Sequence, residues 1–263
     1  MSKAMGKVYL IGAGPGAPDL ITLRGARLLA HADIVFYDAL VHPDTIALAE
    51  KAEKIAVGKR CGRYSTAQRF INKRLIDAAG RYQTVVRLKG GDPMLFGRAQ
   101  EEIDALQAAG VEFEVVSGVT AVLAASAELG IALTQRGVSR SVSLVTPRIG
   151  DGENASNWAT SVCNADSAAL YMAAGQAREI ATRLIAGGLP WDTPAVIVEN
   201  ASLPEVTRTA TTLGALQRAP ERVTHGPALI LIGRMFKRAA VNRRGDAFDR
   251  DAVLEASTAT VCA

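Results

Sequence analysis

The chain has 263 residues, of which 49% are apolar, with a formal net charge of +4 and a pI of about 9.1. No segment reaches the roughly 18 uncharged apolar residues of a membrane span, and the first residues lack the apolar core of a signal peptide, so we expect a cytoplasmic protein without a membrane anchor. Its three cysteines and three histidines are scattered, and aromatic residues make up 5%, so we expect no metal site, no disulfide scaffold and no nucleic-acid partner.

The first predicted strand, residues 8–11, runs into Gly12-Ala13-Gly14-Pro15-Gly16-Ala17-Pro18-Asp19. This spacing nominally fits the dinucleotide fingerprint G-x-G-x-x-A, which needs a helix that starts at the loop and aims free N–H groups at a pyrophosphate. Pro15 and Pro18 lack an N–H and disfavour helical geometry in the residue before them. We therefore expect the helix to begin later, with Thr22 as its N-cap and residues 23–30 as its body, and the loop to hold a ligand without a pyrophosphate.

Strands and helices alternate through the first half of the chain. We expect further strands at 33–37, 54–57, 84–88 and 112–116, and helices from Pro43 and over 65–79, 98–109 and 121–130. Such alternation is typical of a parallel, doubly wound sheet. In these sheets ligands bind beyond the carboxyl ends of the strands.

The fourth predicted strand ends in the stretch around which the chain is organised, Arg87-Leu88-Lys89-Gly90-Gly91-Asp92-Pro93, with Phe96-Gly97-Arg98 close behind. Glycines at a strand end let the backbone approach a ligand and adopt positive φ. The alternative is a tight turn that is merely rich in glycine. The agreement of several strand ends favours a small-molecule site.

The second half of the chain reads as another α/β unit after a polar linker at 133–139. Its predicted strands are residues 141–146, 167–172, 194–198, 206–211 and 228–232, and its main helix is 177–186. We therefore expect an N-terminal domain over 7–133, a C-terminal domain over 140–238, and a disordered tail over 239–263 that is charged and lacks periodicity.

Two motifs resemble those of the tetrapyrrole methylases. The opening Val8-Tyr9-Leu10-Ile11-Gly12-Ala13-Gly14-Pro15-Gly16 with Asp19-Leu20-Ile21-Thr22 resembles the first motif of that family, and Val57-Gly58-Lys59-Arg60 with the 87–98 stretch is similar to its uroporphyrinogen-III C-methyltransferase group. The resemblance, over roughly residues 7–238, implies two α/β domains with the active site in a cleft between them, and a homodimer. It implies transfer of methyl groups from S-adenosyl-L-methionine to C2 and C7 of uroporphyrinogen III, giving precorrin-2 by way of precorrin-1 and releasing S-adenosyl-L-homocysteine.

The resemblance also implies roles for individual residues. The catalytic pair would be Asp38 as base and Lys59 as acid. The cofactor contacts would be Pro15, Gly90, Gly91, Asp92, Leu95, Thr120, Ala121, Met172, Ala201 and Ala228. The substrate contacts would be Arg98, Glu101, Arg136 and Met172.

The residue types suit the implied reaction, but each of these residues can also have an ordinary structural role. Guanidinium groups bind carboxylates in pairs of hydrogen bonds, which suits a substrate with eight carboxylates, but Arg98 and Arg136 can equally be surface charges. Asp38 can equally be a turn residue at a strand end, Lys59 a solvated side chain, Met172 a core residue and Glu101 part of a helix first turn.

Three other functions stay open at this stage. The chain can be a sibling methylase that acts later on the corrin path, on ribosomal RNA or on protein. It can be a nicotinamide oxidoreductase that uses the first glycine loop, or a binding module without activity. The pathway that a precorrin-2 product would feed (sirohaem, cobalamin or haem d1) is also open.

Overall fold

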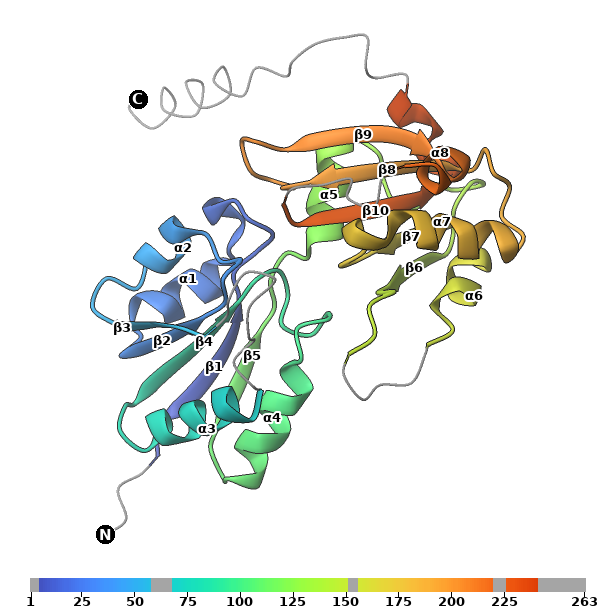
Figure 1. The fold of residues 1–263 in the computed structure, drawn as a ribbon. Helices are drawn as coiled ribbons and strands as arrows, with labels where there is room; N and C mark the ends of the chain where they lie inside the picture. The colour runs from blue at the N-terminus through green and yellow to red at the C-terminus, as the bar shows by residue number, and fades with distance from the viewer. Residues whose placement is uncertain (1–4, 58–67, 151–155, 220–225, 241–263) are drawn as a thin grey trace, which may run out of the picture.

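The computed structural model describes residues 5–57, 68–150, 156–219 and 226–240, and it arranges them around two five-stranded sheets (Figure 1). The expected acid Lys59, the first residues of the helix predicted over 65–79 and the predicted tail beyond 240 lie outside these ranges. Within the described part of the chain no helix has the length and apolar character needed to cross a membrane.

The first sheet is parallel throughout and has the strand order β3-β2-β4-β1-β5. Its elements are β1 (Lys7–Gly12), α1 (Leu23–Ala30), β2 (Ile34–Tyr37), α2 (Pro43–Ala47), β3 (Glu53–Ala56), α3 (Gln68–Ala79), β4 (Thr84–Lys89), α4 (Ala99–Ala108) and β5 (Phe113–Val116). The helix after the first loop begins where the sequence predicted, because the Thr22 side chain accepts a hydrogen bond from Gly25 N at 3.1 Å. A short 3-10 turn, η1 (Pro18–Leu20), precedes it.

Helices cover both faces of this sheet, as a doubly wound fold requires. Alternate residues of each strand point to opposite faces. On one face Leu10 and Phe36 pack with Leu75 of α3 and Leu106 of α4. On the other face Val35, Val86 and Leu88 pack with Leu29 of α1 and Ala49 next to α2. This alternation decides which strand residues meet α4, a point that matters for the site.

The second sheet is mixed, with the order β6-β7-β10-β8-β9. Its elements are β6 (Val142–Val145), α6 (Trp158–Cys163), β7 (Ser167–Leu170), η2 (Ala174–Gln176), α7 (Ala177–Ala186), β8 (Pro194–Glu199), β9 (Thr207–Thr212), α8 (Leu213–Gln217), β10 (Ala228–Gly233) and η3 (Arg234–Ala240). Only the β6–β7 pair is parallel among the described strands of this sheet; β7–β10, β10–β8 and β8–β9 are antiparallel.

Helix α5 (Ala121–Leu129) packs on the second sheet, not on the first. Its buried Val122, Ala125 and Leu129 share a core with Val196 of β8 and Leu231 of β10, and Figure 1 shows α5 beneath β8 and β10. Helices α6, α7 and α8 cover the opposite face. This packing differs from the expected division at 133, which assigned the helix to the N-terminal domain. The chain therefore leaves the first sheet between β5 and α5.

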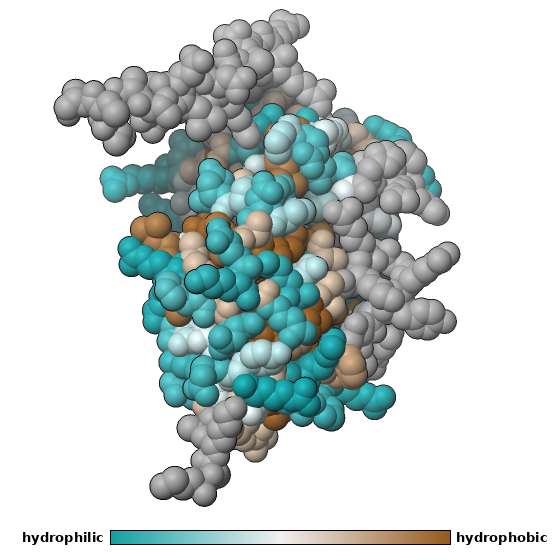
Figure 2. Space-filling model, turned by 90° about the vertical axis from the view of Figure 1, so that its left-hand side faces the viewer, coloured by the Kyte–Doolittle hydropathy of each residue, from teal (hydrophilic) through white to brown (hydrophobic). Residues whose placement is uncertain are grey.

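The surface of the molecule is of mixed character. Figure 2, which looks onto the side of α1 and α2, shows a largely hydrophilic face with hydrophobic residues gathered across its middle. Several large apolar side chains are exposed, among them Leu40, Met94, Phe96 and Met172. All four follow the ends of strands or lie in the loop after β4, where the sequence predicts a ligand.

Candidate active site

Three glycine turns meet beyond the carboxyl ends of β1, β4 and β5. Gly14 and Gly91 form an antiparallel bridge, in which Gly91 N donates to Gly14 O at 2.7 Å and Gly14 N donates to Gly91 O at 3.2 Å. A Cβ on Gly118 would lie 2.2 Å from Gly91 O, so the third turn fits here only without a side chain. The structure thus brings together segments that lie about a hundred residues apart in the sequence.

Asp92 fastens the turn after β4 to the turn after β5. Its Oδ2 accepts a hydrogen bond from Gly118 N at 2.9 Å, and its Oδ1 accepts one from Met94 N at 2.8 Å. Both carboxylate oxygens therefore bind backbone amides of the protein. This geometry assigns Asp92 a role in shaping the site; its expected contact with the cofactor stays a prediction.

The backbone at Gly90 and Gly91 is open on one side. Among the described residues, a Cβ on Gly91 would come no closer than 4.0 Å to a neighbouring heavy atom, the Cα of Thr120, and a Cβ on Gly90 no closer than 3.5 Å. Gly91 has φ +68°, which favours glycine. Packing with the described residues does not require glycine at these two positions, so the space beside them is available to a ligand.

The remaining cofactor candidates lie at the end of the second sheet that receives α5. Met172 lies two residues beyond Leu170, which pairs with Ile230, and Ala228 begins β10 at the same end of the sheet. Ala201 is buried two residues beyond Glu199, the residue that pairs with Ala228. The antiparallel order of β7, β10 and β8 therefore gathers three residues that the sequence separates widely.

Tyr171 connects the two sides of this region. Its hydroxyl group is 2.8 Å from Thr120 Oγ1 and accepts a hydrogen bond from Val122 N at 3.2 Å, so it caps the start of α5. Its ring lies 5.1 Å from the ring of Phe96, centroid to centroid. Burial raises the pKa of Tyr171, which keeps the hydroxyl protonated.

A second contact joins the first glycine loop to the second sheet. Ala17 N donates to Ser202 Oγ at 3.0 Å, and a Cβ on Gly16 would lie 2.9 Å from Leu203. The half-buried Pro15 lies between Gly14 and this contact. The candidates Pro15, Leu95, Thr120 and Ala121 are thus all in segments that border the meeting of the two sheets.

Of the four substrate candidates, Arg98 and Arg136 are exposed arginines on two different loops, Glu101 lies in the first turn of α4, and Met172 follows β7. Arg98 immediately precedes α4 with φ 55°, and its guanidinium group binds the Glu101 carboxylate through two hydrogen bonds of 2.7 Å. This pairing lowers the pKa of Glu101. Arg136 lies in the tight turn closed by Gln135 and Ser139. The structure brings Arg98 and Glu101 together and leaves Arg136 on a separate turn.

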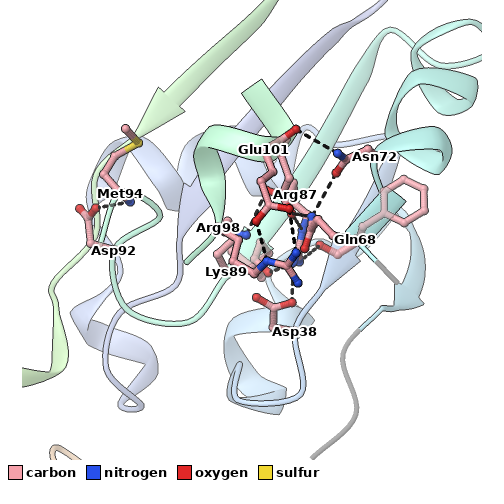
Figure 3. A network of polar contacts seen from close by, with 12 residues as sticks. Asp38, Gln68, Asn72, Arg87, Lys89, Asp92, Met94, Arg98 and Glu101 are labelled. Atoms are coloured by element: carbon pink, nitrogen blue, oxygen red, sulfur yellow. Dashed lines mark hydrogen bonds and ion pairs between the residues drawn. The ribbon is translucent and has the colours of Figure 1, made fainter. Parts of the chain in front are cut away.

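Asp38 follows β2 and lies on the same face of the sheet as Phe36. Arg87 Nη2 donates to Asp38 Oδ1 at 2.5 Å, and Arg87 Nε donates to Glu102 Oε1 at 3.0 Å (Figure 3). Lys89 Nζ donates to the second oxygen of Glu102, also at 3.0 Å. The side chains of Arg87, Lys89 and Glu102 are 3%, 3% and 0% exposed, whereas that of Asp38 is 31% exposed.

The surroundings of the two cations shift their pKa values in opposite directions. Burial lowers the pKa of Lys89, the neighbouring guanidinium group of Arg87 lowers it further, and Glu102 opposes both. Burial alone would lower the pKa of Arg87, but the carboxylates of Asp38 and Glu102 outweigh it and raise the pKa above its ordinary value. Arg87 therefore stays charged between two carboxylates.

Arg87, Lys89 and Glu102 were not predicted from the sequence to take part in the site. The alternation of residues in β4 could have predicted that Arg87 and Lys89 are buried, because it places residues 85, 87 and 89 on one face of the sheet. Val85 belongs to the core beneath α3 and α4, so two cations on the same face need a buried carboxylate on a covering helix. Glu101 and Glu102 are both candidates for this carboxylate. Which of them points toward the sheet depends on the rotation of α4 about its axis.

Comparison with known proteins identifies the class. Residues 7–217 match the model of the Tetrapyrrole (Corrin/Porphyrin) Methylases. The chain belongs to this family. The α/β class expected from the sequence, with two sheets of five strands, is confirmed by this match and by a solved relative.

Particular relatives narrow the comparison. A uroporphyrinogen-III C-methyltransferase of Pseudomonas aeruginosa is 42% identical over 233 residues, covering 88% of this chain and 95% of that protein. The structure of a uroporphyrin-III C-methyltransferase of Thermus thermophilus complexed with S-adenosylhomocysteine is similar with a TM-score of 0.79 and 37% identity, covering 88% of this chain and 99% of that one. A siroheme synthase of Sodalis glossinidius is 40% identical over 231 residues, which cover 88% of this chain but 49% of that protein. The chain thus spans about half the length of the siroheme synthases it matches.

Proposed function

We propose that the chain is a uroporphyrinogen-III C-methyltransferase that uses S-adenosyl-L-methionine, methylating C2 and C7 to give precorrin-2 by way of precorrin-1. The observation that carries the proposal is the pairing of the Gly14 and Gly91 turns, with open space beside Gly91, next to the end of the second sheet that holds Met172 and Ala228. Two relatives that this chain matches over nearly their whole length, both named as C-methyltransferases, support the same activity.

The residues fit the cofactor by their chemistry. The cofactor has no phosphate, and α1 begins at Leu23, past the proline-containing loop, so α1 does not start at that loop as the dinucleotide fingerprint requires. Among the described residues the space beside Gly90 and Gly91 is not filled, so a ligand can come close to the backbone there. When bound, the cofactor supplies a methyl group on a sulfonium that already leaves readily. The protein therefore needs to align the reacting atoms and exclude water.

The substrate side requires cations and one exposed carboxylate. Arg98 and Arg136 are exposed and can bind substrate carboxylates with charge-assisted hydrogen bonds. In this proposal a substrate carboxylate competes with Glu101 for Arg98. The Asp38 carboxylate, held by Arg87, stabilises positive charge on the attacked pyrrole or accepts a proton during rearomatisation. Lys59 stays the predicted acid.

We extend the proposal to the assembly and the pathway. The enzyme works as a homodimer in the cytoplasm on a tetrapyrrole substrate, without a nucleic-acid partner or a metal ion. Precorrin-2 is a branch point, and the choice between sirohaem, cobalamin and haem d1 stays open.

Calorimetry with S-adenosylhomocysteine and NADH tests the class of cofactor. We expect saturable binding of S-adenosylhomocysteine and no heat from NADH, because the first loop lacks the helix that a pyrophosphate needs. A second arm incubates the protein with methyl-labelled cofactor and three acceptors without oxygen: uroporphyrinogen III, ribosomal RNA and a protein extract. Label on the tetrapyrrole supports the proposal; NADH binding, or label confined to RNA or protein, contradicts it.

A further inference from the structure

The strongest unused feature of the molecule is the buried carboxylate of Glu102, on the first turn of α4. One carboxylate here binds two cations, Arg87 through Oε1 and Lys89 through Oε2. Gln68 Nε2 donates a further hydrogen bond to Oε1 at 3.0 Å, and its amide group also binds Asn72. A fully buried carboxylate with this many donors is fixed in position, since rotation of its side chain would break several bonds at once.

Glu102 in turn fixes the orientation of Arg87. The planar guanidinium group donates from Nε to Glu102 and from Nη1 to the carbonyl oxygens of Phe36 and Leu88 at 3.4 and 3.2 Å. Nε and Nη1 are therefore both held by hydrogen bonds. Because the guanidinium group is planar and rigid, fixing these two nitrogens also fixes the direction in which Nη2 points. That third site, Nη2, donates to Asp38.

We propose that Glu102 is a positioning residue, which holds Arg87 so that Arg87 presents the Asp38 carboxylate to the substrate. The inference rests on the proposed function, in which Asp38 acts on the substrate. Exposure along the chain of contacts supports it, because Glu102 and Arg87 are enclosed and Asp38 alone of the four charged residues reaches solvent. Lys89 supplies the second cation, which fixes the remaining oxygen of Glu102.

The rival explanation is that Glu102 serves stability alone, by neutralising buried cations. A variant pair separates the two. Glu102→Met removes the carboxylate and leaves Lys89 and Arg87 as buried cations, so we expect the Tm to fall by roughly 10 °C. Lys89→Met/Glu102→Met removes both members of that pair at similar volume, so we expect most of the lost Tm to return.

The turnover number kcat distinguishes positioning from a role in stability alone. If Glu102 positions Arg87, kcat for uroporphyrinogen III falls about 100-fold in Glu102→Met, as misplacement of a catalytic group does, and stays low in the double variant. KM for the cofactor and the affinity for S-adenosylhomocysteine stay near wild type in both. A kcat that returns together with the Tm overturns the inference. Asp104→Asn, an exposed acid on the same helix, is the control and keeps wild-type values.

A thermal cycle tests the inference without using activity. If Glu102 holds Arg87 toward Asp38, Glu102→Met already weakens the Arg87–Asp38 bond, so Asp38→Asn should cost less Tm in that background than in wild type. We therefore expect the combined loss of Tm to be smaller than the sum of the two single losses. Additive or larger losses, which simple neutralisation of a buried cation gives, overturn the inference. If wild-type protein fails to turn over uroporphyrinogen III, the proposed function is wrong and this cycle still decides whether Glu102 acts on Asp38. If Glu102→Met does not fold, Glu102→Gln, which keeps the shape, replaces it in every arm.

Discussion

Two aspartates at neighbouring strand ends do different work because their partners differ. Asp92 binds backbone amides with both oxygens and so holds two turns together. Asp38 is bound by a guanidinium group and remains partly exposed, which leaves carboxylate surface available to a substrate. Identical side chains therefore separate into a turn-forming residue and a candidate base, and the sequence position alone, just after a strand, does not distinguish them.

Substitutions of single residues divide the site into a cofactor part and a substrate part. We expect Arg98→Ala and Arg136→Ala to lower kcat/KM for uroporphyrinogen III roughly ten- to hundredfold, since losing one charge-assisted hydrogen bond costs about 1.5–3 kcal/mol. Affinity for S-adenosylhomocysteine should hardly change, because the cofactor candidates need no guanidinium group. Steady-state kinetics and a cofactor titration measure both. Equal loss of cofactor affinity would contradict this division.

Asp38→Asn should behave differently from the arginine variants. It keeps the shape of the side chain and an acceptor for Arg87 but removes the charge and the proton acceptor. We expect kcat to fall more than either binding constant changes, in the same kinetic and titration experiments. Full turnover by this variant would leave Asp38 as a turn residue and move the base elsewhere.

At the scale of elements, strand ends and helix starts are connected by single side chains. Tyr171, just after β7, caps α5 and touches Phe96 in the loop after β4. We expect Tyr171→Phe, which keeps the ring, to weaken S-adenosylhomocysteine binding by about three- to tenfold, the equivalent of one neutral hydrogen bond. KM for the tetrapyrrole should stay unchanged. Tyr82→Phe, which loses a hydrogen bond to Glu53 far from the glycine turns, is the control; equal effects of the two variants would argue against a role for Tyr171.

The start of the second sheet depends on an acid whose effect varies with pH. Asp166 accepts hydrogen bonds from Arg140 N, Ser141 N and Ser141 Oγ, and these bonds lower its pKa below the ordinary 3.8. A lowered pKa in the folded state stabilises the fold above the unfolded value and is lost as pH falls through the folded value. We expect Asp166→Asn to lower Tm at pH 7 and to differ less from wild type below about pH 3.8. A difference in Tm that is constant with pH would contradict this.

At the scale of the whole molecule, α5 belongs energetically with the second sheet. We expect Leu129→Ala, a buried substitution that costs about 2–5 kcal/mol, to speed amide hydrogen exchange in β8 and β10 more than in β1 and β4. The physical reason is the shared core of Leu129, Val196 and Leu231. Exchange measured by mass spectrometry would contradict the account if β1 and β4 lost protection instead. On this packing we propose a domain boundary between β5 and α5.

Much of the fold could be predicted from local patterns in the sequence. The alternation of strands and helices in the first half of the chain predicted the parallel sheet, and Thr22 as an N-cap predicted the start of α1. The mixed second sheet was not predicted, because strand direction depends on which distant segments pair. Helix α6 was missed because its six residues lack a capping pattern and a full amphipathic repeat. The sequence did not indicate which sheet α5 packs on, because an apolar helix can cover either one.

The candidate site divides in the same way. Glycine turns after strands and the acid after β2 could be found from sequence, since the residue types act locally. The link from Glu102 through Arg87 to Asp38 could not, because it depends on the register Phe36–Arg87 and on the phase of α4. Contacts between the sheets, such as Ala17 with Ser202, join residues 185 positions apart. Local patterns carry no information on such pairs.

The number and position of methyl groups on the product test the central claim most directly. The protein is incubated without oxygen with uroporphyrinogen III and S-adenosyl-L-methionine labelled with ¹³C in its methyl group, and the product is examined by NMR. The account predicts two labelled methyl carbons per macrocycle, at C2 and C7, with a singly labelled C2 species at early times. Label at other ring positions, or an unlabelled tetrapyrrole in the presence of active cofactor, would contradict it.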